Sequence, residues 1–288
     1  LRKMTPFFTR FFGNPSSLHQ AGRITKRAIN TARVGIANIV GARKEEIIFT
    51  GSGTESDNLA IIGAAHANVK FGKHIIVSKI EHKAVLEAAK KLKSEGFDIT
   101  YLDVDGSGFV KLAELKKYLR KDTILVSIQY ANNEIGTIQQ IPEISKIIRK
   151  FRDERRFPLF HTDACQAAGA LTLEVNNLGV DLMTFNGSKI YGPKGIGCLF
   201  IKRGVNVEPQ ILGGSQEMGL RAGTENVPLI VGLFEALRLA DKIKDQEGNR
   251  QIRLRDCFIK NVLKLIDGVN LNGHPQARLP NNINISVR

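Results

Sequence analysis

Cysteine is scarce in this chain of 288 residues. Its three cysteines, Cys165, Cys198 and Cys257, stand far apart and form no CxxC pair. Disulfide frameworks and cysteine-rich metal sites need cysteines in larger numbers or at close, regular spacings. We therefore expect neither kind of site, and we predict no bound metal.

Long apolar runs are also missing. No stretch offers the roughly 20 consecutive apolar residues that a membrane-spanning helix needs, and Leu1 to Met4 do not begin a secretory signal. Hydrophobic residues make up 42% and charged residues 24% of the chain, which is ordinary for a soluble globular protein. We expect a cytoplasmic protein with no membrane partner.

Acidic residues are outnumbered, with 28 Asp and Glu against 42 Lys and Arg, a net charge of +14. Such an excess can indicate a nucleic-acid or acidic partner. The most basic stretch, residues 148–156, continues a helical apolar pattern and contains two acidic residues. Charge runs of this kind usually mark a solvated face. We interpret it as an exposed helix end and predict no direct binding of nucleic acid.

Short apolar strands alternate with amphipathic helices along the chain. Strands are predicted over residues 47–49, 74–78, 98–102, 123–128, 158–161, 182–185 and 197–201. Helices are predicted over residues 23–40, with a stop at Gly41, and over 54–69, 83–95, 112–119, 141–152, 227–244 and 252–266. This alternation predicts an α/β fold, a mostly parallel sheet with helices on both faces. The polar stretch 241–249 predicts a boundary between a large domain, 1–245, and a small one, 246–288.

Ligands in such sheets bind beyond the carboxyl ends of the strands, and polar segments follow several predicted strands. After residues 47–49 come Gly51, Ser52, Gly53 and Thr54, whose N–H and hydroxyl groups could hold a phosphate. The later glycines and the lysine of a Walker loop are absent, which excludes a nucleoside-triphosphate loop. A helix capped after a tight turn explains the same residues equally well.

Two further segments carry groups with clear chemical uses. Asp163 directly follows a predicted strand and could keep a ring nitrogen cationic, or it could cap the next helix. Lys189 lies in a loop flanked by small and turn-forming residues. A lysine partly withdrawn from water can form a Schiff base with an aldehyde, but most loop lysines are simply exposed. Lys194 has similar neighbours, so these patterns do not separate the two.

Weaker signals come from three more loops. His82 could stack on an aromatic ring or act as an acid or base, or it could only cap or pack. Asn133 could donate a hydrogen bond to a ring oxygen. Thr224 offers a hydroxyl, and Arg221 an anion contact or a structural ion pair. Taken together in chain order, these loops supply the parts that a phosphorylated aromatic aldehyde needs.

At this point the sequence resembles the cysteine desulfurases of the class-V aminotransferase family. The resemblance rests on blocks in the same order at residues 12–19, 54–58, 81–82, 132–136, 163–166, 188–195 and 221–224. The block around Lys189 and the order of all the blocks are highly specific. The resemblance covers nearly the whole chain and implies the large domain of a fold-type I pyridoxal-phosphate transferase, followed by an incomplete small α+β domain.

The resemblance also implies pyridoxal phosphate as the cofactor, with a role for each residue. Lys189 is expected to bind it covalently and to move the proton at the substrate's α carbon, with His82 on the ring face. Asp163 is expected to pair with the ring nitrogen. Gln166 and Asn133 are expected to hold the cofactor and tune its ring oxygen. Phosphate contacts are expected from Gly53, Thr54, Asn186 and Ser188, and from Thr224 of the neighbouring subunit of a homodimer.

The activity implied by the resemblance is removal of sulfur from L-cysteine, giving alanine and an enzyme persulfide. The sulfur would pass to an iron–sulfur scaffold or another sulfur acceptor, including tRNA-thiolation pathways. A selenocysteine lyase, another class-V aminotransferase and a non-catalytic protein that only binds partners are the alternatives. Retention of Lys189, Asp163, His82 and Gln166 argues against the last of these.

The sequence departs from the family in two respects. Many members have Ser-x-His before the lysine, where this chain has Asn186-Gly187-Ser188, which keeps hydrogen-bond donors but loses a possible positive charge. None of the three cysteines lies at the family's persulfide position. Family members also have segments before the match to Leu1 and beyond the match to Arg288, so we expect a fragment lacking both ends.

Overall fold

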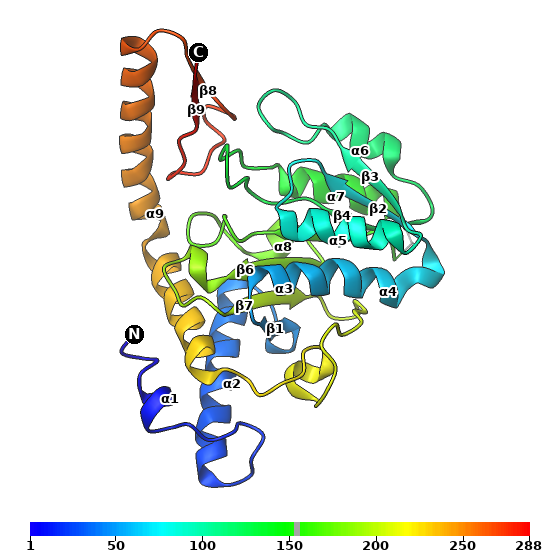
Figure 1. The fold of residues 1–288 in the computed structure, drawn as a ribbon, viewed down its shortest axis with the longest axis vertical. Coiled ribbons are helices and arrows are strands. Elements are labelled where there is room, and N and C mark those ends of the chain that lie inside the picture. The colour runs from blue at the N-terminus through cyan, green and yellow to red at the C-terminus, as the bar shows by residue number, and fades with distance from the viewer. Residues whose placement is uncertain (153–155) are drawn as a thin grey trace.

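The computed structural model describes residues 1–152 and 156–288, and a seven-stranded sheet forms its centre (Figure 1). The strands of this sheet are β1 Ile47–Thr50, β2 His74–Ser78, β3 Asp98–Leu102, β4 Thr123–Ser127, β5 Leu159–Asp163, β6 Leu182–Asn186 and β7 Gly197–Ile201. Two short strands, β8 Val269–Leu271 and β9 Ile285–Val287, pair antiparallel apart from it. Each strand predicted from the sequence is present.

The strands of the large sheet follow the order β1-β7-β6-β5-β4-β2-β3. Only β7 runs antiparallel to its neighbours, β1 and β6, while the pairs from β6 to β3 are parallel. The carboxyl ends of all strands except β7 therefore meet at one edge. The mostly parallel sheet predicted from the alternation is confirmed, and its edge gathers loops that are far apart in the chain.

Helices cover both faces of the sheet, as predicted (Figure 1). They are α1 Pro6–Thr9, α2 Gln20–Val40, α3 Gly53–Asn58, α4 Ala64–Asn68, α5 Lys83–Ser94, α6 Leu112–Tyr118, α7 Ile141–Arg152, α8 Val175–Leu178 and α9 Val227–Leu265. Successive side chains of a strand point to opposite faces. Ile47 and Phe49 accordingly join the core under α2, α7 and α9, while Ile48 joins the core under α3, α4 and α5.

Local signals explain where several helices begin and end. The ring of His19 accepts a hydrogen bond from the N–H of Gly22 and caps α2, which ends at Gly41 with φ 69°, as predicted. A π-helical turn, Leu59–Gly63, joins α3 to α4, so the predicted helix 54–69 is nearly continuous. Residues 153–155 of the basic stretch lie outside the described residues.

Helix α9 corrects one prediction. The sequence predicted two helices, 227–244 and 252–266, but the structure has a single helix of 39 residues. The polar stretch between them stays helical because its charges pair one turn apart. Lys244 lies 2.7 Å from Asp241, and Arg250 lies 2.6 Å from Glu247. The predicted division at residues 245 and 246 stays a prediction, since α9 crosses it without a break.

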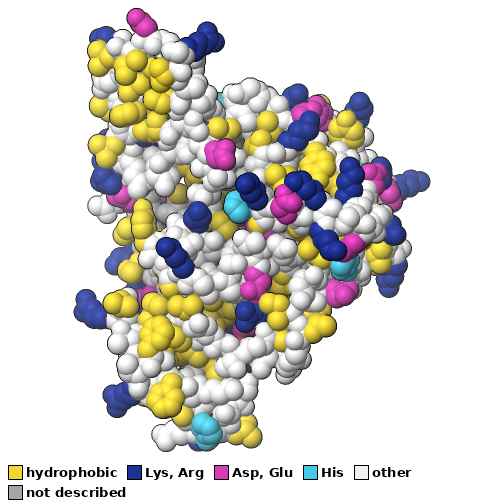
Figure 2. All heavy atoms as spheres, in the orientation of Figure 1, with side chains coloured by type: hydrophobic (Ala, Val, Ile, Leu, Met, Phe, Trp, Pro, Cys, Tyr) yellow, Lys and Arg dark blue, Asp and Glu magenta, His cyan; other side chains and the backbone are white. Residues whose placement is uncertain are grey.

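The C-terminal half of α9 is more apolar at its surface than a solvated helix needs to be. Its exposed side chains include Leu254, Phe258, Leu263 and Leu265. Figure 2 shows hydrophobic side chains gathered at this end of the molecule, at the upper left. As for membranes, the described helices include none that combines the length and the apolar character needed to cross one.

Candidate active site

One cavity at the carboxyl edge of the large sheet collects most of the predicted site residues. Its lining is Gly53, Thr54, Asp57, His82, Gln129, Ala131, Asn133, Asp163, Cys165, Gln166, Asn186 and Lys189. These residues follow β1, β2, β4, β5 and β6. Of the residues predicted to bind the cofactor, all except Ser188 and Thr224 line this cavity. These side chains lie close together because the carboxyl ends of parallel strands share one edge of the sheet.

Asp163 forms part of the cavity floor. It ends β5, is 8% exposed, and its Oδ1 accepts a hydrogen bond of 2.9 Å from the N–H of Cys165. Burial raises the pKa of Asp163, and hydrogen bonds from the backbone and thiol of Cys165 oppose that rise. A buried carboxylate is most stable beside a positive charge. Asp163 is therefore suited to face a cationic group in the cavity.

Gly53 lies where the backbone approaches the other loops most closely. A Cβ atom at this position would stand 2.7 Å from Nδ2 of Asn186 and 2.9 Å from Sγ of Cys165. Ser52 caps α3 by accepting the N–H of Glu55 at 3.0 Å. The capped helix considered from the sequence is therefore present. The cap leaves the first N–H groups of the helix and the exposed hydroxyl of Thr54 beside the cavity, where an anion is favoured.

Lys189 extends from the lip of the cavity. Strand β6 ends at Asn186, whose Oδ1 caps a 3₁₀ turn, Gly187–Lys189, by accepting the N–H of Lys189 at 3.3 Å. The turn presents Lys189 to the cavity, while Lys194 is not among the lining residues. The lysine side chain is exposed in this structure, which is the second of the two alternatives that the sequence left open. It stands at the lip because the turn lifts it above the floor.

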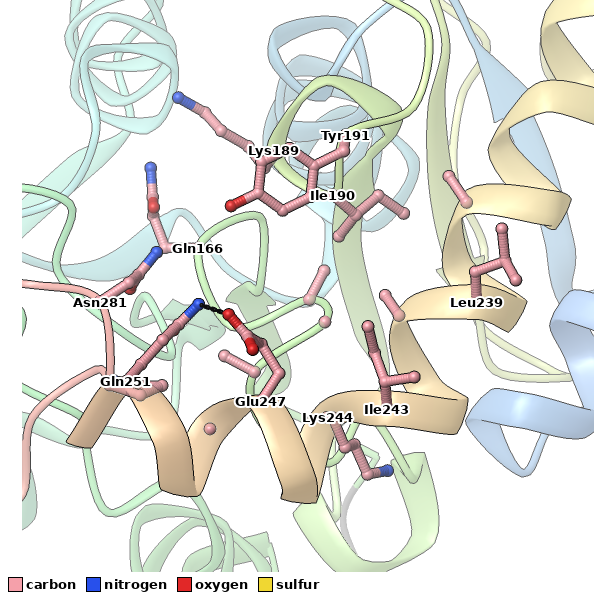
Figure 3. Close-up of a pocket in the computed structure, with 17 residues that line it drawn as sticks. Gln166, Lys189, Ile190, Tyr191, Leu239, Ile243, Lys244, Glu247, Gln251 and Asn281 are labelled. Atoms are coloured by element: carbon pink, nitrogen blue, oxygen red, sulfur yellow. Dashed lines mark hydrogen bonds between the residues drawn. The ribbon is translucent and has the colours of Figure 1, made fainter. Parts of the chain in front are cut away.

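A second, more apolar cavity adjoins the first, and Lys189 and Gln166 line both. Figure 3 shows it between the turn at Lys189 and helix α9, with Leu239 and Ile243 on the helix side. The Lys189 side chain points away from α9 in this view. On the helix, Gln251 donates a hydrogen bond of 2.8 Å to Glu247. The amine therefore stands at the junction of two hollows.

His82 and Asn133 stand at the mouth, and both are exposed. The Nδ1 of His82 accepts the N–H of Ala84 at 3.1 Å and caps α5. The sequence left capping and ring stacking as alternatives; the cap is present, and the ring also lines the cavity. Asn133 follows Asn132, whose Oδ1 accepts the N–H of Glu134 at 2.9 Å and shapes that loop.

Ser188 and Thr224 lie outside the cavity lining. Ser188 is exposed, and its hydroxyl lies 3.4 Å from Oδ1 of Asn186. Thr224 lines a different hollow, beside Gly51 and Gly195. Arg221, which the sequence left as an anion contact or an ion pair, pairs with Glu55 at 2.9 Å. The predicted reach of Thr224 into a neighbouring subunit stays a prediction.

The chain's similarity to known proteins agrees with this arrangement. Residues 1–288 match the family described as Aminotransferase class-V. The chain belongs to the class-V aminotransferase family. The cysteine desulfurase IscS of Dictyoglomus turgidum is 53% identical over 283 residues, which cover 98% of this chain and 71% of that protein.

Solved structures give the same family. A structure titled as a NifS-like protein superimposes with a TM-score of 0.95 and 38% identity, covering 99% of this chain and 77% of that one. One titled as SspA in complex with cysteine has a TM-score of 0.78 and 40% identity, covering 82% of this chain and 67% of that one. The resemblance seen in the sequence is confirmed, and this class-V aminotransferase is a cysteine desulfurase.

Two buried acidic residues at the cavity of this desulfurase carry no clear signal in the sequence. Asp57, 1% exposed, lies one helical turn after Gly53, and Glu81, 5% exposed, lies in the loop after β2. Burial raises the pKa of Glu81 to about 8. The spacing of Asp57 from Gly53 was the available signal, because residues four apart share a helix face. Nothing local indicates that this face meets β5.

Three groups at the floor and mouth come close enough to share one ligand. Asp57, His82 and Asp163 each place one possible ligand atom within 4.8 Å of the others. The sequence predicted no metal site. This set of groups suits a cationic ring nitrogen as well as it suits a metal ion, because carboxylates stabilise either positive charge.

Proposed function

We propose that this cysteine desulfurase binds pyridoxal phosphate in the cavity at the carboxyl edge of its large sheet. Desulfurases of this family depend on that cofactor. The observation that carries the proposal is that Lys189 and Asp163 line the same cavity, the amine at its lip and the carboxyl at its floor. These are the two groups that a pyridine aldehyde requires, one for its carbonyl carbon and one for its ring nitrogen.

The residues present fit the cofactor on structural grounds. A Cβ at position 53 would stand 2.7 Å from the Asn186 side chain and 2.9 Å from that of Cys165, so glycine lets the start of α3 approach both and leaves the space open for a phosphate. We propose that Gly53, Thr54 and Asn186 hold the phosphate. Ser188 is proposed to support this group through its contact with Asn186, a contact that orients the amide.

The remaining residues are assigned to the ring and the substrate. When bound, the cofactor draws electrons from the α carbon of an amino acid. Asp163 keeps the ring nitrogen protonated, and His82 covers one ring face. Gln166 and Asn133 donate hydrogen bonds to the ring oxygen. Lys189 holds the cofactor covalently, and its amine moves the proton at the substrate's α carbon.

L-Cysteine is the proposed substrate, with alanine and a protein persulfide as products. The relative titled as a complex with cysteine supports this choice. Cys165 lines the cavity, but burial and the neighbouring Asp163 raise its pKa well above the ordinary value. A thiol in that state is a poor nucleophile. We therefore propose that the sulfur passes to a thiol other than Cys165, and then to an iron–sulfur scaffold or another acceptor.

A homodimer is part of the same proposal. Thr224 is exposed in a hollow separate from the cavity of its own chain, on a loop that Arg221 ties to Glu55. We propose that this loop brings Thr224 to the phosphate of a second copy. A Thr224→Ala variant that remains dimeric should then bind the cofactor more weakly.

Lys189→Ala, compared with Lys194→Ala, tests the function. The purified parent and Lys194→Ala should be yellow and release alanine from L-cysteine when a dithiol reductant is present. Lys189→Ala should lose both the yellow absorbance of a cofactor held by an amine and the release of alanine. Retention of covalent cofactor by Lys189→Ala after dialysis would overturn the assignment.

A further inference from the structure

Asp57 is a carboxyl group buried without a counter-charge. Its side chain projects from α3 into the floor of the cavity, it is 1% exposed, and its Oδ1 has no hydrogen-bond partner among the described residues. Among the described residues, no lysine or arginine forms an ion pair with Asp57. Removing an ionised carboxylate from water without a partner is costly, so such groups usually stay protonated.

The surroundings of Asp57 favour the neutral form further. An oxygen of Asp57 lies within 4.8 Å of an oxygen of Asp163, and Glu81, when ionised, adds to the negative field. Burial and Asp163 raise the pKa of Asp57 well above its ordinary value, while a hydrogen bond from Thr184 opposes the rise. Two carboxyl groups this close share one proton over a wide pH range.

The histidine beside Asp57 does not supply the missing positive charge. Nε2 of His161 lies 3.7 Å from Oδ1 of Asp57, with both side chains buried. The two ring nitrogens of His161 instead lie 2.8 Å from the hydroxyl of Ser127 and 3.1 Å from that of Thr184. Burial lowers the pKa of His161 to about 3, so its ring is neutral.

The other titratable groups around Asp57 are few. Cys165 stands two residues after Asp163, and a charge on Asp57 would raise the pKa of its thiol further. His82 stands at the mouth, within the same 4.8 Å cluster. Its ring is exposed and already accepts the N–H of Ala84, so it sits at the solvent side of the pair. None of these contacts pairs Oδ1 of Asp57 with a cation.

We propose that Asp57 is a positioning residue that stays protonated, so that the Asp57–Asp163 pair carries one negative charge and places it on Asp163. The part of this that concerns the ring nitrogen rests on the proposed function. A second charge on Asp57 would attract the cation away from Asp163 and deeper into the floor. The neutral carboxyl fills that space and leaves Asp163 as the single acceptor.

Asp57→Asn, which keeps the shape but cannot ionise, tests the protonation state without the cofactor. An acid whose pKa is raised by folding contributes stability that is present below its unfolded pKa, about 3.9, and is lost as the pH rises toward the folded value. In cofactor-free protein, Asp57→Asn should therefore melt higher than the parent at pH 8, with an advantage that shrinks toward pH 5. Asp245→Asn, at an exposed site on α9, should show no such trend.

A lower melting temperature of Asp57→Asn at pH 8, with a deficit that grows with pH, would overturn the proposal. It would show that Asp57 works as an ionised group. Zn²⁺ alone, added to cofactor-free parent and variant, gives a second check. A rise in melting temperature that the parent shows and Asp57→Asn lacks would identify an ionised metal ligand and would also overturn the proposal; an equal response in both supports it.

Proteins with bound cofactor test which carboxyl group of the Asp57–Asp163 pair carries the negative charge. Asp57→Asn should keep the pH dependence of the yellow absorbance, whereas Asp163→Asn should shift or abolish it. A shift in Asp57→Asn equal to that in Asp163→Asn would overturn the assignment of the charge to Asp163. If no variant and no parent binds the cofactor while the melting trend holds, the proposed function fails and the neutral state of Asp57 stands.

Discussion

Asp163 and Lys189 face one cavity from the ends of neighbouring strands. Asp163 is paired with Thr184 in the register of β5 and β6, and the turn after β6 carries Lys189 back over the cavity. The carboxyl lies at the buried floor and the amine at the exposed lip. A planar ligand with a ring nitrogen at one end and a carbonyl carbon on the same ring could contact both.

Adding a methyl group at position 53 should weaken cofactor binding. In Gly53→Ala the new Cβ would stand 2.7 Å from Nδ2 of Asn186, so the Asn186 side chain must leave its position beside the phosphate loop. We expect at least a roughly tenfold loss of affinity, about 1.4 kcal/mol, in a titration followed by absorbance. In Gly106→Ala the Cβ meets nothing within 4 Å, and its affinity should be unchanged. Equal affinities of the two variants would contradict the cradle.

Glu81 should make the protein less stable at alkaline pH. Its pKa is raised to about 8 by burial, against hydrogen bonds from Ser78 and the N–H of Gln129. The stability associated with its protonated form is present below the unfolded pKa and is lost as the pH rises through about 8. Glu81→Gln should therefore gain stability over the parent, by roughly 1–3 kcal/mol at pH 9.

Urea unfolding at pH 5 and pH 9 measures this effect. The gain of Glu81→Gln should be small at pH 5, where the buried acid is protonated in the folded protein. Glu134→Gln, at an exposed position, serves as the control and should show no difference between the two pH values. A loss of stability by Glu81→Gln that is greater at pH 9 would contradict the prediction.

His161 should contribute to unfolding in acid. Burial lowers its pKa to about 3, so the folded protein keeps the ring neutral while the unfolded chain takes up a proton near pH 6.5. The stability it contributes is present above that pH and is lost as the pH falls toward 3. His161→Gln loses hydrogen bonds to Ser127 and Thr184. It should be less stable by about 1–3 kcal/mol at pH 7.5.

The slope of the unfolding free energy with pH separates the effect of proton uptake by His161 from the effect of its lost hydrogen bonds. Between pH 6.5 and pH 4.5 the parent should lose stability faster than His161→Gln, because only the parent takes up a proton on unfolding at this site. Thermal melting across that range measures both slopes. Parallel slopes would show that His161 does not stay neutral in the folded protein.

A buried ion pair between Glu217 and Arg33 should stabilise the segment that leads to the loop with Thr224. Glu217 accepts two hydrogen bonds from the guanidinium of Arg33, at 2.6 and 2.8 Å, and one from the N–H of Phe49 at 2.8 Å. Removing one partner leaves the other charge buried and unpaired. Glu217→Ala should therefore lose about 3–5 kcal/mol of unfolding free energy.

Chemical denaturation measures the loss at Glu217, and Glu87 provides the comparison. Glu87 pairs with Lys90 on the surface, with both side chains more than half exposed. Exposed pairs contribute little, so Glu87→Ala should be close to the parent. A Glu217→Ala variant as stable as Glu87→Ala would contradict the anchoring role.

Much of the fold followed from local patterns. The seven strands of the large sheet were placed to within two residues, because their apolar runs are short and bounded by polar or glycine-rich turns, and Gly41 ended α2 as expected. The short strands β8 and β9 were not predicted. The gap predicted between helices 227–244 and 252–266 is absent for a local reason as well. Those residues are polar but form helix well, and their charges pair along α9.

For the candidate site, the sequence indicated some residues and only the tertiary structure decided others. Residue type and order in the loops were enough to indicate Asp163, the loop at Gly53 and the lysine-bearing loop after β6, because each follows a strand of one sheet. Similar local sequences around Lys189 and Lys194 could not separate the two lysines. The 3₁₀ turn, which directs only the first of them toward the cavity, depends on contacts with Asn186 of β6 and with Ile196 just before β7.

Only the tertiary structure brings the two acidic residues of the cavity floor together. Asp57 and Asp163 are far apart in the chain, and each is an ordinary surface-type residue when considered by itself. Packing α3 against α5, β6 and β7 buries Asp57 and sets it beside Asp163 at the end of β5. Protonation depends on burial and on near neighbours rather than on sequence order. The charge of this floor therefore arises only when the sheet and its helices are assembled.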